Sequence, residues 1–370
     1  DSLELYNAQS IYLKGLGEGE PVKAIKAVGN TVQIGEALNK KSTLYVVTDT
    51  QMSLSNRLGV PINGIIGYDF FKDFVVEFDF VHSSLKAYNP EEYRYKNCRR
   101  CSDFNLLIKE HKPYIEATAE IEEGKELSVK LLVDSGSSDA VWLFKNKKRE
   151  IEVPPAFFQD FLGFGIGGSV YGKRSRIKRL SLGNLSMKDV TASFPDTLYF
   201  QNVKTFSDRD GSLGAVVLKR FSAVFDYGSN RLRLKPNRYF RDPFEYDMSG
   251  VVVAHSGFGI VKDLVNSQSP KKITGDYTGT GERVYQDSYQ VQFSLQPQFK
   301  VVEIRPDSPA ERAGLLIGDI LVSLNGRAAY RYSLNDINSL LSSEEGKKIR
   351  LKINREGAEK EIAFRLERIL

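Results

Sequence analysis

An aspartate at the end of an apolar strand is the first residue of this sequence that could do chemistry. Residues 127–133 have an apolar side chain at every odd position, which is typical of a half-buried β-strand. The strand runs directly into Asp134-Ser135-Gly136. A carboxylate in such a place is costly unless donors satisfy it; Ser135 offers a hydroxyl and Gly136 allows close backbone approach. The pattern predicts an acid presented in a shielded cleft.

The chain is built on an internal repeat. Residues 64–80 (GIIGYDFFKDFVVEFDF) and 211–227 (GSLGAVVLKRFSAVFDY) share two glycines and a Phe-Asp pair at an offset of 147 (211 − 64). Upstream, Gly15-Leu16-Gly17 resembles Gly165-Ile166-Gly167 at an offset of 150. Each copy indicates short strands with glycine turns, one short helix and a strand hairpin. A repeat of this length exceeds that of a solenoid and predicts two similar lobes that face each other.

Each copy also contains a Gly-Asn pair between two strand-like segments. The pairs are Gly29-Asn30 and Gly183-Asn184. Both residue types tolerate positive φ, so we predict a hairpin turn at each pair.

Taken together, residues 10–236 resemble the retropepsin- and pepsin-like aspartic proteases. The triplet Asp134-Ser135-Gly136 matches their catalytic motif. The glycine-rich turns match their substrate-covering flap, at Gly165, Ile166 and Gly167 and again at Gly15 and Gly17. The apolar-glycine pairs Leu213-Gly214 and Ile66-Gly67 match the element that supports the catalytic loop from beneath. The resemblance implies a mostly β protein with two barrel-like lobes.

The resemblance also implies a chemistry that needs two lobes. One aspartate from each lobe would share a single proton, because two carboxylates about 3 Å apart cannot both ionise. The ionised member would take a proton from water, and the protonated member would polarise the peptide carbonyl. No metal or organic cofactor is implied.

Only lobe 2 shows a triplet. The two offsets place its counterpart at 134 − 150 = −16 or 134 − 147 = −13, before Asp1, so we expect the chain to begin partway through lobe 1. Thr48-Asp49-Thr50 follows the flap-like segment and lacks the glycine, which argues against it as the partner. The remaining nearby aspartates are expected at turns, caps and helix ends: Asp69, Asp79, Asp139 and Asp226.

The C-terminal third has a different pattern. Residues 261–290 are polar and without apolar period, which predicts a long loop or linker. Residues 299–326 predict a strand, a short helix with proline at its start, a glycine stop and a strand ending in an Asn-Gly turn. Ser-Pro-Ala, Ala-Gly-Leu and Gly-Asp-Ile-Leu in this segment resemble bacterial PDZ domains.

The PDZ resemblance implies a groove that binds the carboxyl-terminal end of a peptide as an added strand. Helix 334–341 would flank the groove with Ile337 and Leu341. The carboxylate-binding loop is expected at Gly257, Phe258, Gly259 and Ile260. The alternative is that these glycines form a plain strand turn, or that the module only packs against its neighbour.

Composition limits the other functions. The 370 residues are 41% hydrophobic and 27% charged with a net charge of +5, which argues against a nucleic-acid-binding surface. No apolar run reaches the ~18–20 residues needed to span a membrane, and the first residues do not resemble a signal peptide. Two cysteines, Cys98 and Cys101, cannot complete a zinc site, so a local disulfide or two idle thiols remain.

We therefore expect three units: lobe 1 (residues 1–92), lobe 2 (93–248) and a PDZ domain (249–370). The leading hypothesis is an aspartic endopeptidase whose PDZ domain recruits peptides or regulates cleavage. The alternatives are a non-catalytic peptide-binding scaffold and a dimer that pairs Asp134 with its twin; the sequence does not fix the oligomeric state. Bacterial chains that combine such units are typically exported, so the resemblance implies the periplasm or cell surface.

Overall fold

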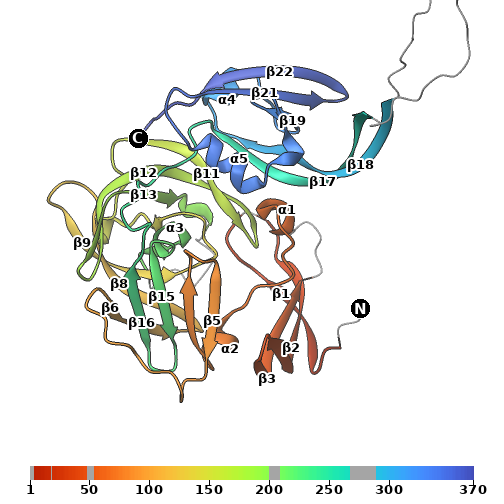
Figure 1. Ribbon diagram of the computed structural model, residues 1–370. Helices are drawn as coiled ribbons and strands as arrows, with labels where there is room; N and C mark the ends of the chain where they lie inside the picture. The colour runs from red at the N-terminus through yellow and green to blue at the C-terminus, as the bar shows by residue number, and fades with distance from the viewer. Residues whose placement is uncertain (1–3, 18, 48–53, 200–208, 267–288) are drawn as a thin grey trace, which may run out of the picture.

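The computed structural model describes residues 4–17, 19–47, 54–199, 209–266 and 289–370 (Figure 1). Its regular structure is mostly β, with short helices, which confirms the predicted fold class. Figure 1 shows the two lobes side by side and the C-terminal domain packed above them. Within the described ranges, no helix is long and apolar enough to cross a membrane.

Lobe 2 contains an eight-stranded sheet. Its strands, in hydrogen-bonded order, are β11 (Phe157–Gly165), β12 (Gly168–Leu182), β13 (Leu185–Pro195), β10 (Val141–Leu143), β14 (Gly211–Leu213), β9 (Glu126–Val133), β8 (Lys112–Glu120) and β7 (Leu107–Lys109). Strand β12 also pairs with β8, so the sheet closes into a barrel. The β12–β13 turn falls at Gly183-Asn184 as predicted, and Gly183 takes a φ of +54°.

Lobe 1 contributes a three-stranded antiparallel sheet of β1 (Ala8–Leu13), β2 (Val22–Ile34) and β3 (Ala37–Val47). The predicted turn at Gly29-Asn30 is wrong, because the β2–β3 turn lies at Gly35-Glu36. Gly29 instead sits at an irregularity inside β2, where the pairing register shifts on either side of Asn30. Asn30 is buried and its side chain accepts a hydrogen bond from the Tyr6 N–H, at 3.0 Å. The polar residue is therefore used for a tertiary contact.

A five-stranded sheet joins the lobes. Its order is β5 (Ser84–Tyr88), β4 (Val75–Asp79), β15 (Phe221–Asp226), β16 (Arg231–Pro236) and β6 (Ser102–Asn105). At its centre, Glu77 of β4 pairs with Val224 of β15, its own counterpart in the repeat (224 − 77 = 147). On either side, Phe78 pairs with Ala223 and Val76 pairs with Phe225. Ala223 is the repeat equivalent of Val76, and Phe225 is the repeat equivalent of Phe78. The register of this pair of strands is therefore pseudo-twofold symmetric about Glu77 and Val224.

The helices of the lobes are short and repeat with the same offset. Helix α2 (Tyr68–Phe71) and helix α3 (Ala215–Leu218) are related by 147 residues at both ends. Each follows an extended glycine cap, Gly67 or Gly214. The other helical segments in the described parts of the lobes are α1 (Leu54–Leu58) and the 3-10 turns Lys147–Arg149 and Thr197–Tyr199.

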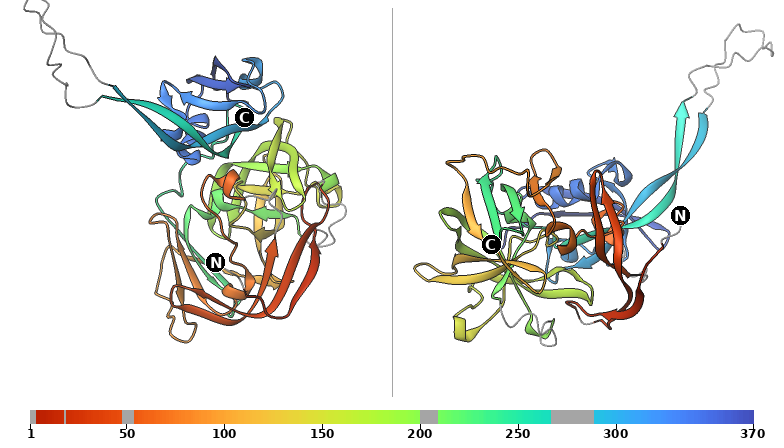
Figure 2. Two further views of the ribbon diagram at one scale, coloured as in Figure 1. Left: turned by 90° about the vertical axis from the view of Figure 1, so that its right-hand side faces the viewer. Right: turned by 90° about the horizontal axis from the view of Figure 1, so that it is seen from below.

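The C-terminal domain is a separate β unit with its own core. Its strands are β17 (Val251–Asn266), β18 (Tyr289–Ile304), β19 (Ile320–Leu324), β20 (Arg327–Ala328), β21 (Lys348–Arg355) and β22 (Ala358–Arg365). Its helices are α4 (Pro309–Arg312), the 3-10 turn Ala329–Arg331 and α5 (Leu334–Leu341). The ends of the predicted loop 261–290 belong to β17 and β18, which project as a two-stranded arm (Figure 2), and 267–288 lie outside the described residues.

A buried arginine fixes the connection between lobe 2 and the C-terminal domain. Arg220 is 1% exposed and follows α3. Its guanidinium donates to the backbone carbonyls of Tyr239, Asp242 and Pro243 and stacks on Phe244, 3.7 Å from the ring centroid. Burial lowers the pKa of Arg220, and the carbonyls satisfy its donors. The connecting segment is thereby attached to the barrel.

Candidate functional site

The 134–140 loop lies between β9 and β10. Strand β9 runs parallel to β14, with Val133 opposite Leu213, and the Asp134 N–H donates to the Leu213 carbonyl at 2.9 Å. The Gly136 N–H donates to Asp134 Oδ1 at 3.0 Å. Asp134 is half-buried, whereas Ser135 and Gly136 are exposed. The acid is therefore held at the barrel edge with its turn open to solvent.

The apolar-glycine pair lies directly beneath this loop. Leu213 is fully buried, and the N–H of Gly214 donates to the Ala140 carbonyl at 2.9 Å. A Cβ at Gly214 would lie 2.2 Å from the Asp139 carbonyl oxygen. Only glycine allows this approach, so the support that the resemblance implied for Leu213 and Gly214 is brought together with Asp134.

The two glycine turns meet each other. The N–H of Gly167, at the tip of the β11–β12 hairpin, donates to the Leu16 carbonyl at 2.8 Å. A Cβ at Gly165 would lie 2.3 Å from the Leu16 oxygen, and one at Gly17 equally close to the Gly167 backbone. A Cβ at Gly15 would lie 2.7 Å from Ile166. Residues from the two copies of the repeat are thus in direct backbone contact at these turns.

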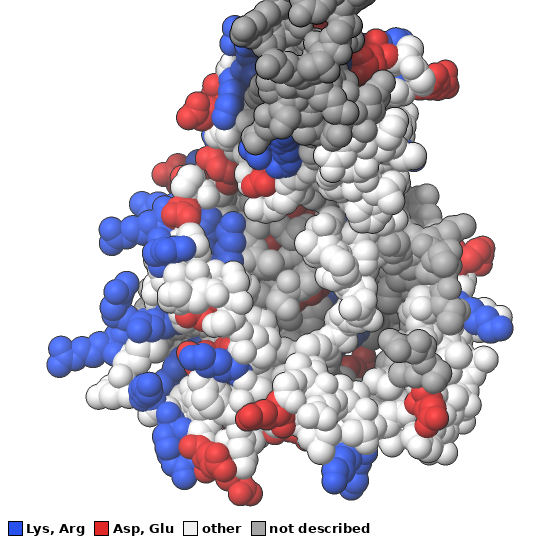
Figure 3. Space-filling model, turned by 45° about the vertical axis from the view of Figure 1, so that its right-hand side comes forward, with Lys and Arg blue, Asp and Glu red and all other residues white. Residues whose placement is uncertain are grey.

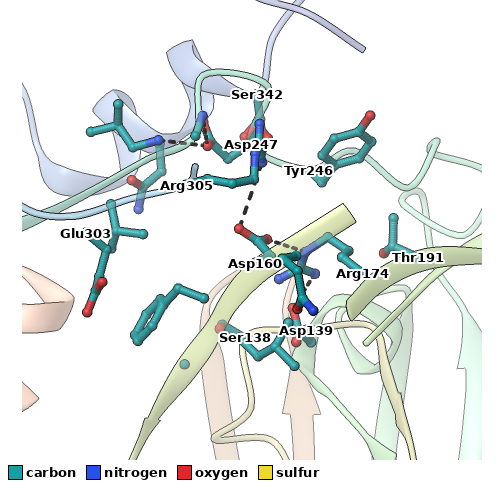
Figure 4. Close-up of a pocket in the computed structure, with 18 of the residues that line it drawn as sticks. Ser138, Asp139, Asp160, Arg174, Thr191, Tyr246, Asp247, Glu303, Arg305 and Ser342 are labelled. Atoms are coloured by element: carbon teal, nitrogen blue, oxygen red, sulfur yellow. Dashed lines mark hydrogen bonds and ion pairs between the residues drawn. The ribbon is translucent and has the colours of Figure 1, made fainter. Parts of the chain in front are cut away.

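A chain of buried and partly buried ion pairs links the 134–140 loop to the C-terminal domain (Figure 4). Asp139 accepts from Arg174 Nη1 at 2.8 Å, and Arg174 Nε donates to Asp160 at 2.7 Å. Asp160 lies 3.8 Å from Nη1 of Arg305, which follows β18. We name Asp139, Arg174, Asp160 and Arg305 the ion-pair ladder.

Asp139 is the most enclosed carboxylate of the ladder. It is 7% exposed, and its Oδ2 accepts from the indole N–H of Trp142 and from the Ser193 hydroxyl. Burial alone would lower the pKa of the Arg174 guanidinium, but the Asp139 and Asp160 carboxylates outweigh burial and hold this pKa above its ordinary value. Asp139 is therefore a structural anchor of the 134–140 loop.

Sequence reasoning placed Asp139 only as a cap or turn residue and did not identify the ladder. Arg174 is 35 residues from Asp139, and Arg305 is far beyond both. The one local signal was the presence of opposite charges, Asp160 and Arg174, on the two strands of the predicted flap hairpin.

A pocket of about 500 Å³ lies beside the ladder, between lobe 2 and the C-terminal domain. Lobe 2 contributes the β11–β12 hairpin, including Leu162 and Tyr171, and Ser138 of the 134–140 loop. The C-terminal domain contributes the first residues of β17, the end of β18 and the second half of α5. Tyr171 of β12 also donates to the Glu303 carboxylate at 3.0 Å. The pocket thus lies at the interface of lobe 2 and the C-terminal domain and is lined by both.

In the segment that precedes β17, the carboxylate of Asp247 is surrounded by hydrogen-bond donors. Asp247 accepts hydrogen bonds from the backbone N–H groups of Ser249, Gly250 and Val251 and from the Ser249 hydroxyl. Burial raises the pKa of Asp247. The N–H of Met248 donates to the Leu341 carbonyl at the end of α5, which places this loop beside the helix.

The residues predicted for the PDZ groove lie in two places. Ile337 and Leu341 of α5 are buried in the domain core. Gly257, Phe258, Gly259 and Ile260 lie within β17, where the pairing with β18 shifts between His255 and Phe258. Phe258 and Ile260 are 68% and 73% exposed. The structure thus separates the two sets, and the loop next to α5 is formed by residues 246–250.

Lobe 1 lacks a counterpart of the 134–140 loop among the described residues. Residues 64–66 are equivalent to β14 (211 − 147 = 64), yet they form no strand. Ile65 and Ile66 are 82% and 46% exposed, whereas β14 is buried between β9 and β10. Thr48-Asp49-Thr50 lies outside the described residues.

Surface charge and the cysteines complete the description. Figure 3 shows a face on which Lys and Arg gather along the left-hand edge, with Asp and Glu interspersed. Cys98 and Cys101 form a disulfide, which decides between the two readings that the sequence left open.

Comparisons with known proteins divide the chain in the same way. Residues 117–217 match the family model described as aspartyl protease, and residues 300–355 match the one described as PDZ domain. These matches confirm the two resemblances: the chain contains an aspartyl-protease-type domain followed by a PDZ domain.

Curated relatives match over short stretches. The carboxy-terminal processing protease CtpB of Bacillus subtilis is 34% identical over 71 residues, 19% of this chain and 15% of that protein. A probable CtpA-like serine protease of Staphylococcus haemolyticus is 27% identical over 122 residues, 30% of this chain and 23% of that protein. The chain thus spans less than a quarter of the length of either relative.

Solved structures show a distant likeness. The HtrA-type protease AlgW with decapeptide has a TM-score of 0.22 at 10% identity, over 97% of this chain and 81% of that one. The same protease with tripeptide has a TM-score of 0.20 at 12% identity, over 80% and 92%. At these TM-scores the likeness supports no argument.

Proposed function

We propose that this protein is an aspartic endopeptidase in which Asp134 is one of the two catalytic carboxylates. The observation that carries the proposal is the position of Asp134. It lies at the end of β9, next to Leu213 and Gly214 of the neighbouring strand and helix cap. The glycine turns that meet near Gly167 supply a cover that can exclude water and hold a substrate backbone. The match of residues 117–217 to the aspartyl protease model supports the same reading.

The proposed mechanism needs a second carboxylate in lobe 1. We propose that it comes from an apolar strand ending in Asp-Ser-Gly or Asp-Thr-Gly that pairs with residues 64–66. The exposed Ile65 and Ile66 support this, because their lobe 2 equivalents are buried by β9 and β10. Gly67 is already extended before α2, as Gly214 is before α3, so the support is formed in advance.

With both acids in place, the chemistry follows from their proximity. Two carboxylates at close range share one proton, so one remains ionised and acts as general base on a bound water. The protonated partner donates to the peptide carbonyl and stabilises the charge that develops there. Asp139 would contribute by anchoring the loop through Arg174, Trp142 and Ser193.

The C-terminal domain is proposed to recruit peptides. A PDZ domain supports peptide binding, and a groove would lie between α5 and β17. Ile337 and Leu341 would support α5 from the core, and we propose that Gly257–Ile260, which lie further along β17, extend the strand edge beyond the groove. The Cys98–Cys101 disulfide supports an oxidising location such as the periplasm or cell surface. The domain limits 1–92, 93–248 and 249–370 are part of the proposal.

The test replaces the Asp134 carboxylate by an amide of nearly the same shape. In a protein that contains the proposed second carboxylate, Asp134→Asn should lower the rate of casein cleavage by at least about 10²-fold, because one of the two catalytic carboxylates is lost. Asp189→Asn is the matched control, since Asp189 is an exposed acid on β13 of the same lobe. A statine-type peptide should inhibit the wild-type protein. Equal rates for Asp134→Asn and wild type would contradict the proposal.

A second candidate function is favoured by the open segment 64–66. Without a partner strand the lobes would hold a peptide without cutting it, as a non-catalytic scaffold. The same assay separates the two, because a scaffold binds casein peptides and leaves them intact in both the wild-type and the Asp134→Asn protein.

A further inference from the structure

Beyond the body of the C-terminal domain, β17 and β18 continue as a two-stranded arm that projects away from the rest of the chain (Figure 2). The register pairs Phe258 with Pro297 and Ile260 with Leu295. In an antiparallel pair, directly opposed side chains lie on the same face, and so do side chains two positions apart along a strand. One face of the arm, which we name the arm face, therefore carries Phe258, Ile260, Phe293 and Leu295.

The arm face is apolar and open. Its four side chains are 68%, 73%, 66% and 70% exposed, in chain order. The ring of Phe258 packs edge-on against the ring of His255, with 5.4 Å between the ring centroids, which fixes the end of the arm face nearest the domain. Contiguous apolar surface of a few hundred Å² is rare on monomeric soluble proteins and marks sites of interaction.

The sequence of β18 has the pattern of a half-buried strand at this point. Residues 292–297 read Gln-Phe-Ser-Leu-Gln-Pro, with a polar residue at every even position and an apolar residue at every odd one. Such alternation is typical of a strand with one face in water and the other against a second layer. On the polar face, a Cβ at Gly259 would lie 2.0 Å from the Gln298 amide nitrogen, so the Gln298 side chain lies over the backbone there. The arm thus has one polar and one apolar face, and the apolar face is the open one.

A second copy of the arm is the layer that matches this face best. An isolated two-stranded ribbon is at best marginally stable in water, and packing of its apolar face against another layer stabilises it. Two sheets pack well when their twists match. The arm of a second copy has the same twist, the same length and the same spacing of apolar side chains. Because the arm leaves the body of the chain, two arms can meet without bringing the lobes together (Figure 2).

The charge of the arm face favours self-association. Its four residues are uncharged, and so are Gln292, Ser294 and Gln296, which alternate with Phe293 and Leu295. Two copies can therefore approach through this face without like-charge repulsion at the contact, although the whole chain carries a net charge of +5. Segments that lie on a lipid surface instead carry Lys and Arg beside their apolar face.

The area of the arm face sets the strength of the contact. Four side chains that are about two-thirds exposed present roughly 450 Å² of apolar surface. Two such faces together bury roughly 900 Å², which is close to the lower limit of about 1,000–1,200 Å² for specific interfaces. We therefore expect a reversible association with a dissociation constant in the micromolar range.

We propose that the arm face is the interface of a homodimer in which the arms of two copies pack face to face about a twofold axis. Ile260 and Leu295 lie at the centre of the contact, and Phe258 and Phe293 lie toward its ends. The interface contains no residue of either lobe, so it differs from a dimer that pairs Asp134 with its twin. It does not depend on whether the lobes cleave peptides.

Sedimentation equilibrium of the 370-residue chain at concentrations of about 1–200 μM tests the association. Phe293→Thr combined with Leu295→Thr keeps a high strand propensity and removes most of the apolar area that β18 contributes. Each change counts twice in a symmetric interface, so the dissociation constant should rise at least about 100-fold. Gln292→Thr combined with Ser294→Thr is the matched control on the opposite face of the same strand and should leave the dissociation constant unchanged.

Thiol cross-linking tests which face is buried. Leu295→Cys or Gln292→Cys adds one thiol to a chain whose two cysteines already form a disulfide. A short bismaleimide spans the ~10 Å between packed sheets. It should join two copies through position 295, near the twofold axis, and not through position 292, on the far side of the arm.

Several outcomes would overturn the proposal. A protein that stays monomeric up to about 200 μM has no such interface. An unchanged dissociation constant in the Phe293→Thr, Leu295→Thr protein, or cross-linking through position 292, would place a dimer contact elsewhere. Flotation with phosphatidylcholine vesicles that requires Phe293 and Leu295, without dimer formation, would identify a lipid surface as the occupant. If the double variant loses its circular dichroism spectrum, the two cross-linking variants still decide.

Discussion

The two lobes carry the same apolar-glycine motif in opposite surroundings. In lobe 2, residues 211–213 are buried as β14 between β9 and β10. In lobe 1, residues 64–66 are outside any strand, and Ile65 is 82% exposed. The short helices that follow are nonetheless alike, and each begins after an extended glycine. Local sequence thus specifies the turn into the helix, whereas burial of the motif depends on two strands from elsewhere in the chain.

The same contrast appears at the edges of the shared sheet. On the lobe 2 side, β6 covers β16, and Asp103 accepts from both Arg231 and Arg233. On the lobe 1 side the equivalent positions are Ser84 and Lys86 of β5 (231 − 147 and 233 − 147), and β5 is the last strand of the described sheet. Among the described residues, lobe 2 has strands that cover both its apolar-glycine motif and the last strand of its hairpin, whereas in lobe 1 neither is covered.

The strongest test of this contrast is a matched pair of glycine substitutions. A Cβ at Gly211 would lie 1.8 Å from the Trp142 carbonyl oxygen, whereas one at Gly64 meets nothing within 4 Å. Gly211→Ala should therefore lower the free energy of unfolding by about 3 kcal/mol, because the backbone must move. Gly64→Ala should change it by less than about 0.5 kcal/mol. Urea denaturation of both variants measures the difference.

Completion of lobe 1 sharpens the same comparison. When the proposed partner strand is present, Gly64→Ala should become destabilising, because residues 64–66 would then be enclosed as β14 is. Equal effects of the two substitutions in the chain described here would show that the lobes do not differ in closure.

A smaller effect is expected at the Phe-Asp pair of the repeat. Asp226 is buried and accepts from the Tyr95 hydroxyl at 2.9 Å, and burial together with this bond raises the pKa of Tyr95. Asp226→Ala should lower the free energy of unfolding by about 1–3 kcal/mol, because the hydroxyl loses its acceptor. Asp79, its counterpart, bonds the exposed His82, so Asp79→Ala should cost much less.

Thermal unfolding followed by circular dichroism compares these two variants. A Tyr95→Phe change should remove most of the cost of Asp226→Ala, since the unpaired hydroxyl is then absent. A cost that survives in the double variant would assign it to the Ser229 turn that Asp226 also caps.

The smallest effect concerns the closed edge of the sheet. Hydrogen bonds from Arg233 and Arg231 hold the pKa of Asp103 well below its usual range. A depressed carboxyl pKa stabilises the folded state above the unfolded pKa of about 3.9 and loses that contribution as pH falls toward the folded value. The stability difference between wild type and Asp103→Asn should therefore be constant near pH 6 and shrink below about pH 4. Urea midpoints across this range test it, and a difference that grows on acidification would contradict it.

Much of the architecture could be predicted from the sequence because the signals are local. The offset of 147 indicated two similar lobes, and in the structure Glu77 pairs with its equivalent Val224; Gly183-Asn184 forms the predicted turn. The similar pair Gly29-Asn30 does not, because the Asn30 side chain is used for a contact with Tyr6. A Gly-Asn pair thus does not form a hairpin turn where the Asn side chain makes a tertiary hydrogen bond instead.

By itself, the sequence determined the mostly β class, the duplicated lobes, the Asp134 triplet and the PDZ type of the C-terminal domain. These depend on short-range periodicity and on turn residues, which act within a few positions of the chain. Tertiary structure alone decided that Asp139, Arg174, Asp160 and Arg305 form the ion-pair ladder. It also decided that Nε and Nη2 of Arg305 are buried without a hydrogen-bond partner. Charges become partners only when folding removes water from between them, and no spacing along the chain encodes which ones will meet.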